Sequence, residues 1–185
     1  MLAYVFWHWK RAGVETREYE SCQRAFQRAL NQAPPAGFLG SFGVFTSGAS
    51  WAADGVEVYE DWYLLEDFGA LGPIKEAAVS GIRAAPHNAV AGLAGGGVGG
   101  LYGLRRGEVS YRPRHALWFS KPEGMRYGKL FDQLSPVVDE TRGALWLRQL
   151  VLSPAPEFCL HSEMPVVLPA MFRPMVMPLQ PVWPD

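Results

Sequence analysis

One short stretch of the chain occurs twice, and the elements around each copy follow in the same order. The stretch "VFWHWKRAG" at residues 5–13 resembles "HALWFSKPEG" at residues 115–124. At an offset of 111 residues, three positions carry the same residue in both copies: Trp7 and Trp118, Lys10 and Lys121, Gly13 and Gly124. Three matches can also arise by chance, so the order of the elements is the stronger argument for two related halves.

Each copy begins a strand–helix–strand–strand pattern. Continuous apolar or alternating runs of strand formers predict the strands, and apolar residues at spacings of three and four predict the helices. The helix over residues 15–32, for example, places Tyr19, Cys22, Phe26, Ala29 and Leu30 on one side. The first pattern comprises strand 3–9, helix 15–32 and strands 38–45 and 56–65; the second comprises strand 115–124, helix 125–134 and strands 144–152 and 157–162. A further helix is predicted over residues 70–83, and a hairpin-like connection over residues 46–55.

This order of elements resembles the ferredoxin-like halves of the dimeric α+β barrel superfamily, in its tandem form with both halves in one chain. The resemblance covers residues 3–163 and implies an α+β fold with antiparallel sheets that face each other and helices on the outside. We expect one domain over residues 1–164, with halves of about 1–106 and 107–164, followed by a Pro-rich extended tail at 165–185. Residues 56–104 also resemble a stretch of uncharacterised bacterial proteins, from which no activity follows.

Charge and hydropathy narrow the classes of partner. The formal net charge is -1, and no run of Lys or Arg exceeds two residues, so neither nucleic acid nor a membrane surface is expected as a partner. The first residues place an apolar run before the positive charges, the reverse of a secretory signal, which favours a cytoplasmic protein. The cysteines, Cys22 and Cys159, are expected to be reduced and buried thiols.

A glycine-rich run is a candidate nucleotide-binding loop. Gly95, Gly97 and Gly100 match the G-x-G-x-x-G spacing, but a dinucleotide loop follows a strand and opens a helix. Here a helical or coil segment precedes the glycines and a strand-like segment follows them. We therefore expect a flexible or close-packed connector between the halves, and no nucleotide cofactor.

The strongest candidate site lies in "VEVYEDWYLLED" at residues 56–67. Strand alternation sends Tyr59, Asp61 and Tyr63 to one face. In a barrel, that face could line a wet cavity where Asp61 acts as a general base oriented by Tyr59 or Tyr63. A solvent-facing strand with tyrosines for strand propensity explains the same pattern.

Other candidates are single residues. His8, between Trp7 and Trp9, is either a core histidine or a catalytic group. Arg105 and Arg148, on predicted strands, would need an anion if they face inward, such as Asp61 or a ligand; otherwise they lie at the surface. His87 could line a ligand site, or the His87–Asn88 pair could cap a short helix through Asn88.

Metal binding has weak support. Cys159, His161 and Glu163 alternate along one predicted strand and could ligate zinc with a fourth ligand, but an amphipathic strand gives the same pattern, and no metal is predicted. The resemblance also includes haem proteins of the chlorite dismutase type, which imply a proximal histidine in the second half. Only His115 and His161 lie there, both on predicted strands, so haem is not expected.

The chain contains seven Trp, seven Tyr and ten Phe, more aromatic surface than a core of this size needs. This favours a small apolar or aromatic ligand, with Tyr63, Trp7, Arg105, Arg148 and His87 as ligand-binding candidates and Asp61, Tyr59 and His8 as catalytic ones. The members of the superfamily that it resembles include cofactor-free monooxygenases and isomerases. The alternative is a non-catalytic assembly protein, whose aromatic and Pro-rich surfaces bury a subunit interface in a homodimer or higher homo-oligomer.

Overall fold

All strands in the part of the chain described by the computed structural model, residues 1–52 and 56–185, belong to one antiparallel sheet. Its strand order is β8-β5-β7-β6-β4-β1-β3-β2-β9. The first half contains β1 (Leu2–Lys10), α1 (Thr16–Gln32), β2 (Phe38–Thr46) and β3 (Val58–Leu65). The second half contains β5 (His115–Phe119), α4 (Tyr127–Thr141), β6 (Ala144–Arg148) and β7 (Phe158–Ser162). The predicted α+β class, with two strand–helix–strand–strand patterns, is confirmed.

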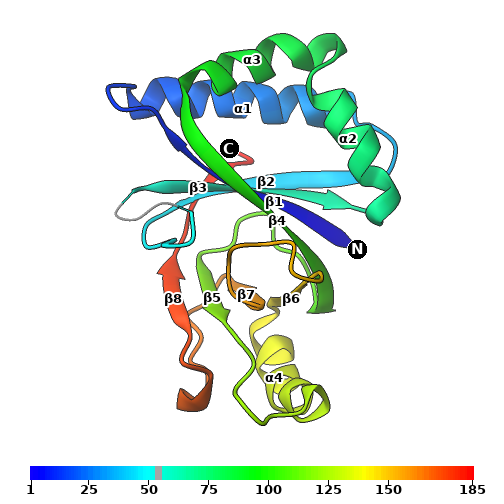
Figure 1. Cartoon of the computed structure of the whole chain (residues 1–185), viewed down its shortest axis with the longest axis vertical. Coiled ribbons are helices and arrows are strands. Elements are labelled where there is room, and N and C mark those ends of the chain that lie inside the picture. The colour runs from blue at the N-terminus through cyan, green and yellow to red at the C-terminus, as the bar shows by residue number, and fades with distance from the viewer. Residues whose placement is uncertain (53–55) are drawn as a thin grey trace.

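The segment between the halves forms the rest of the helical cover and one more strand. It comprises η1 (Phe68–Ala70), α2 (Leu71–Ala78), η2 (Gly81–Arg83), α3 (Ala84–Leu93) and β4 (Ala94–Gly107). Figure 1 shows α1, α2 and α3 as one layer over the strands of the first half, with α4 at the opposite end of the molecule. The layer is unevenly anchored, because α1 buries six residues whereas α3 buries none.

The glycine-rich run is the strand β4, so it is a close-packed element and not a flexible connector. It follows the helix α3 and pairs with β1 on one side and with β6 on the other. A helix followed by a strand is the reverse of the order that a dinucleotide loop requires. The glycines make room for the aromatic rings of β1: a Cβ on Gly99 would lie 2.9 Å from the Tyr4 ring, and one on Gly97 would overlap Phe6.

The two halves use the repeated residues in the same way. Lys10 donates from Nζ to the Val14 carbonyl at 3.0 Å, and Lys121 donates to the Met125 carbonyl at 2.8 Å. The paired glycines both have positive φ, 83° at Gly13 and 73° at Gly124. These shared details favour two related halves over a chance match. The boundaries near 106 and 164 stay predictions, because β4 pairs with strands of both halves.

Several elements differ from their predicted bounds: the helix predicted over residues 70–83 is divided into α2 and η2, and the strand β5 ends at Phe119. The helix α4 continues past Leu134 and through Pro136 to Thr141, because Val138 is buried on the same side as Leu130 and Leu134. The strand β6 ends at Arg148, and the chain turns at Leu150, which has a φ of 54°. Part of the predicted connection at 46–55, residues 53–55, lies outside the described residues.

The tail closes the sheet into a near-barrel. It contains η3 (Ala170–Phe172), β8 (Met175–Pro178) and β9 (Gln180–Trp183). The strand β8 pairs with β5 and β9 pairs with β2, so the two strands lie at opposite ends of the strand order although only Leu179 separates them. The tail is therefore extended across its own chain.

The interior of this near-barrel is filled by tryptophans. Trp7, Trp62, Trp118 and Trp146 are almost fully buried there, and the rings of Trp7 and Trp118 lie 5.7 Å apart. No helix in the described residues is long and apolar enough to cross a membrane.

Candidate functional site

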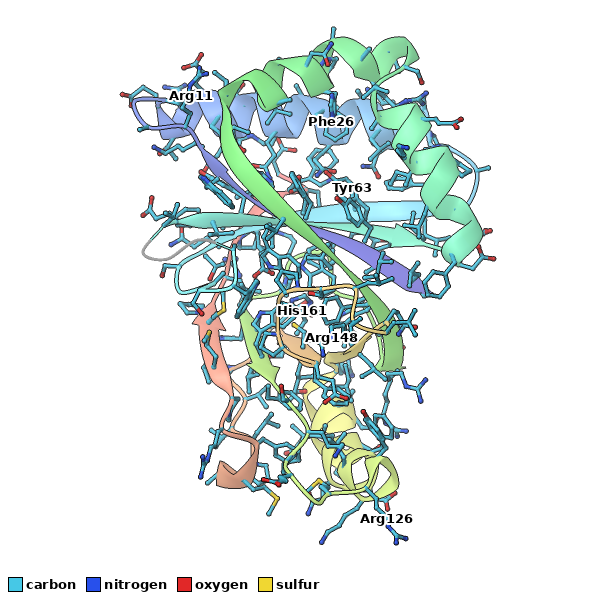
Figure 2. The ribbon with its side chains drawn as sticks, in the orientation of Figure 1. Arg11, Phe26, Tyr63, Arg126, Arg148 and His161 are labelled. Atoms are coloured by element: carbon cyan, nitrogen blue, oxygen red, sulfur yellow. The ribbon has the colours of Figure 1, made fainter. Side chains whose placement is uncertain are left out.

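A cavity of about 590 Å³ lies between the first half of the sheet and the helices α1, α2 and α3. Its wall is mostly apolar. Figure 2 shows Phe26 reaching from α1 toward the sheet and Tyr63 reaching from the sheet toward the helices. The cavity thus lies between sheet and helices, as the aromatic-rich composition led us to expect, and the expectation that the Asp61 face lines the interior of a barrel is wrong.

Strand alternation delivers the polar side chains to the floor of this cavity. Along β3, Tyr59, Asp61 and Tyr63 face the helices, as predicted, whereas Glu60 and Trp62 face the barrel interior. The strand β1 pairs with β3 and places His8 on the same face as Asp61. Both faces of β3 are buried, so the solvent-facing alternative is wrong.

The carboxylate of Asp61 is the centre of the floor, and it is only 3% exposed. Its Oδ1 accepts a hydrogen bond from Gln23 Nε2 at 2.7 Å, and its Oδ2 accepts one from the Tyr63 hydroxyl at 3.0 Å. His8 Nε2 lies 3.3 Å from the same Oδ2. A buried carboxylate with these partners is held in one orientation.

His8 links Asp61 to a second phenol. Its Nδ1 lies 2.6 Å from the Tyr19 hydroxyl. Because a carboxylate only accepts hydrogen bonds, the tautomer with the proton on Nε2 suits both neighbours, with Tyr19 donating to Nδ1. Burial, reinforced by the charge of Asp61, raises the pKa of Tyr19 and of Tyr63. Both phenols therefore stay protonated and act as donors.

A second layer of polar groups supports the floor. Gln27 donates from Nε2 to the Tyr63 hydroxyl at 3.4 Å and accepts from Ser41 Oγ at 2.7 Å. Gly43 on β2 leaves the space that the floor needs, since a Cβ there would lie 2.8 Å from Asp61 Oδ1.

The second half provides an internal comparison for these residues. At the offset of 111 residues, His8, Tyr19, Gln23 and Gln27 correspond to Phe119, Leu130, Leu134 and Val138. Strand pairing relates Asp61, opposite Phe6, to Leu160, opposite Leu117. All five counterparts belong to an apolar core under α4. The fold therefore does not require polar residues at these positions.

The structure brings four of the predicted site residues to the cavity or its edge. His8, Asp61 and Tyr63 line it from the sheet, and His87 lines it from α3, with its ring 5.3 Å from that of Phe26. The ring of Tyr59 stacks on the ring of His8, with 5.6 Å between the ring centres.

The hydroxyl of Tyr59 points away from the floor, toward Glu20 Oε1 at 3.4 Å. Burial and the charge of Glu20 raise the pKa of Tyr59. Asn88 lies inside α3, which begins at Ala84, so the prediction that it caps a helix is wrong.

The other predicted ligand-binding residues lie away from this cavity. Trp7 points into the barrel. Arg105 is exposed and lies over the Phe131 ring at 5.3 Å. Arg148 donates from one terminal nitrogen to the Ala155 carbonyl at 3.0 Å.

Three residues of the site were missed as functional candidates. Tyr19 was assigned to an apolar helix face, and Gln23 and Gln27 were not singled out. The signal was present, because the three lie four residues apart along the buried side of α1. Two buried glutamines on an otherwise apolar face indicate hydrogen-bond partners on the sheet below.

The proposed zinc ligands do not converge. Both Cys159 and His161 point into the barrel, where burial lowers the pKa of His161 to about 3. Glu163 lies outside β7 and accepts a hydrogen bond from Ser110 Oγ at 2.6 Å. Cys159 is buried as expected, whereas Cys22 is only half-buried; both are free thiols. The described residues contain no group of three or more His, Cys, Asp or Glu that could hold a metal ion.

A haem bound through a histidine of the second half does not fit these residues. The helix-covered face of that half is filled by the apolar core under α4. Figure 2 shows His161 on the opposite side of the sheet from Tyr63, and its ring packs against Trp62 at 4.5 Å. His115 lies on β5, paired with Ser162 and Pro178.

Two of the solved structures with a similar fold match over nearly the whole chain. A "putative monooxygenase" from Lactobacillus acidophilus matches with a TM-score of 0.59 and 10% identity, covering 98% of this chain and 94% of that one. A variant of chlorite dismutase from Candidatus Nitrospira defluvii matches with a TM-score of 0.50 and 9% identity, covering 98% and 92%. No protein-family model matches the chain, and a search of curated proteins finds no relative.

The chain therefore has the fold of the dimeric α+β barrel proteins. At these identities the likeness concerns the fold, and the function has to be argued from the site.

Proposed function

We propose that this protein binds a small, largely apolar aromatic molecule in the cavity under α1, α2 and α3, and that Asp61 accepts a proton from it without a nucleotide cofactor. The observation that carries the proposal is the polar floor. Four polar residues meet at the bottom of an apolar cavity: His8, Tyr19, Gln23 and Asp61. Their counterparts in the second half are all apolar. Burying a carboxylate costs free energy, so a buried carboxylate that the fold does not require indicates a functional site.

The volume supports a small-molecule ligand. Ligand cavities typically measure about 300–1,000 Å³, and this one measures about 590 Å³. Its aromatic wall includes Tyr4, Phe6 and Phe26, which suit flat apolar rings.

The floor is arranged for proton transfer. Asp61 has both oxygens fixed by Gln23 and Tyr63, so its basic lone pairs keep one direction. His8 presents its Nε2–H to Asp61 Oδ2 at 3.3 Å and so supports the negative charge of the carboxylate. The Tyr19 hydroxyl is hydrogen-bonded to the other imidazole nitrogen of His8. Tyr19, His8 and Asp61 therefore form a polar chain that can polarise as the charge on Asp61 changes.

Native mass spectrometry of the untagged protein, compared with its denatured mass, tests the binding step. We expect an additional mass of a few hundred daltons that disappears on denaturation. With that molecule identified, NMR in D₂O measures whether the protein exchanges a carbon-bound acidic proton of the molecule for deuterium; hydroxyl and amine protons exchange without the protein. Asp61→Asn should abolish the exchange and keep the binding, while Glu57→Gln, an exposed carboxylate just before β3, should leave both unchanged. Exchange that survives in Asp61→Asn refutes Asp61 as the base.

Assembly is the second candidate function, and an exposed apolar loop favours it. Leu150 and Val151, in the connection between β6 and β7, are 80% and 83% exposed. Adjacent apolar side chains of this kind mark contact surfaces. We expect two or more copies of the chain to associate, and the same mass measurement counts them. A Leu150→Ser, Val151→Ser variant that keeps the oligomer intact refutes a role for this loop.

A further inference from the structure

The cavity floor has one buried acceptor that nothing in the described chain satisfies. Gln23 is 1% exposed and lines the cavity. Its Nε2 donates to Asp61, which fixes the orientation of the amide because the carboxylate can only accept. The amide oxygen, Oε1, has no hydrogen-bond partner among the described residues. A buried acceptor without a partner is costly unless a ligand or water donates to it.

The two hydroxyl donors of the floor are already engaged, and His8 Nε2, which makes no hydrogen bond among the described residues, lies against Asp61 Oδ2 at 3.3 Å. The hydroxyl of Tyr63 donates to Asp61, and the hydroxyl of Tyr19 lies against His8. Apart from His8 Nε2, which is directed at Asp61, the remaining capacity at the floor is for accepting: Gln23 Oε1 and the unfilled lone pairs of the Asp61 carboxylate. A ligand group with a negative charge would meet the Asp61 carboxylate, and the donor left without a hydrogen bond, His8 Nε2, faces that same carboxylate.

The walls above this floor are aromatic on both sides. Tyr4 and Phe6 lie on the sheet side, and Phe26 and His87 lie on the helix side. An apolar cavity of about 150 Å³ holds one benzene molecule. A cavity of about 590 Å³ therefore has room for two or three rings.

We infer that the ligand is an aromatic molecule of two or three rings whose polar end is a hydroxyl or amine that donates hydrogen bonds to Asp61 and Gln23. This inference rests on the proposed function and adds the chemical class of the ligand. The ring system lies between the sheet-side and helix-side aromatics, and the polar end carries no negative charge.

Four naphthalene derivatives test the class: 2-naphthol, 2-naphthylamine, 2-methoxynaphthalene and 2-naphthoate, each titrated by calorimetry into the full chain. The ring is constant, so differences in affinity report the polar end. We expect at least one of the two donors, naphthol or naphthylamine, to bind about tenfold or more tightly than the methyl ether. Naphthoate should bind most weakly. The order of naphthol and naphthylamine identifies which donor the floor prefers.

A substitution taken from the other half assigns the effect to Gln23. Gln23→Leu introduces the residue found at the matched position, Leu134, so it suits a helix packed on this sheet. We expect it to bring the preferred donor to within about threefold of the methyl ether, whose own affinity stays the same. Gln23→Met, which keeps the length of the side chain, should behave alike. Gln32→Leu, an exposed glutamine at the end of α1, is the matched control and should change nothing.

The possible failures are distinguishable. If the methyl ether binds as tightly as both donors, or naphthoate binds most tightly, the ligand class is wrong and the proposed aromatic site stands. If Gln23→Leu and Gln23→Met both keep the full donor preference, the role given to Gln23 is wrong. If no naphthalene derivative binds, the proposed function fails together with this inference.

Discussion

Replacing Glu60 by Gln should make the stability of this protein less sensitive to pH. Glu60 lies on β3 next to Asp61 but points into the barrel, and it is 0% exposed. Its Oε2 accepts from Trp62 Nε1 at 3.2 Å, and its Oε1 has no partner among the described residues. Burial raises the pKa of Glu60 from its usual 4.5 to about 7, and the hydrogen bond from Trp62 only partly opposes this rise.

The pKa difference fixes the sign and size of the effect. Between pH 4.5 and 7 the unfolded chain releases the Glu60 proton while the folded chain keeps it, so stability falls as the pH rises through this range. Each pH unit between the two pKa values corresponds to about 1.4 kcal/mol, which gives a loss of about 3 kcal/mol above pH 7. The neutral amide of Glu60→Gln cannot be deprotonated and escapes this loss.

Urea unfolding followed by circular dichroism at pH 5 and pH 8 measures the difference. The stability difference between Glu60→Gln and the unsubstituted protein should therefore shift by about 2.5 kcal/mol in favour of Glu60→Gln between pH 5 and pH 8. A constant cost of the new amide hydrogens cancels in this comparison. The exposed Glu57→Gln is the control and should show no such difference. If Glu60→Gln differs from the unsubstituted protein by the same amount at both pH values, the reasoning is refuted.

Three further changes test the site, the glycine strand and the tail. Gly43→Ala places a Cβ 2.8 Å from Asp61 Oδ1 and should slow ligand deuterium exchange on the order of 100-fold; an unchanged exchange rate would contradict a tightly fixed carboxylate. Gly97→Val would overlap the Phe6 ring on β1 and should lower the free energy of unfolding by about 2 kcal/mol. Gly92→Ala on α3, whose Cβ meets nothing within 4 Å, should not lower it, and equal losses in urea unfolding would count against the packing argument. Deleting residues 175–185 removes β8 and β9 and should cost at least about 5 kcal/mol, because it exposes the core and loses the burial of three apolar side chains, Met177, Leu179 and Val182. A thermal midpoint within a few degrees of the full chain would show that the tail does not close the sheet.

The order of elements could be predicted because each element carries its own local signal. The apolar run at the start gave β1, the three- and four-residue spacing gave α1, and alternation gave the two faces of β3. The strand β4 could not be predicted in the same way. Its glycines have no side chains that could show the alternation of a strand. Glycine is required there because the rings of Tyr4 and Phe6 occupy the space, and these two residues lie on a neighbouring strand that is distant in sequence.

The candidate site was predictable in part for a similar reason. Alternation along β3 placed Asp61 and Tyr63 together, and His8 stood out as a polar residue in an apolar run. Which side of the sheet forms the cavity depends on how the sheet curves, and strand alternation alone does not decide this. The role of Gln23 could not be predicted without knowing that α1 packs on β3, because its partner Asp61 is 38 residues away in the sequence.

The uneven anchoring of the helical layer predicts which wall of the cavity moves most easily. The floor strand β3 is buried on both faces, whereas α3 buries no residue and α2 buries only Ile74 and Ala77. Segments with few buried contacts open at a lower free energy than the core does. The amides of α2 and α3 should therefore exchange with D₂O earlier than those of β1 and β3. The helical cover of the cavity is therefore expected to move more easily than its floor, so its fit to a ligand can adjust while β1 and β3 stay folded.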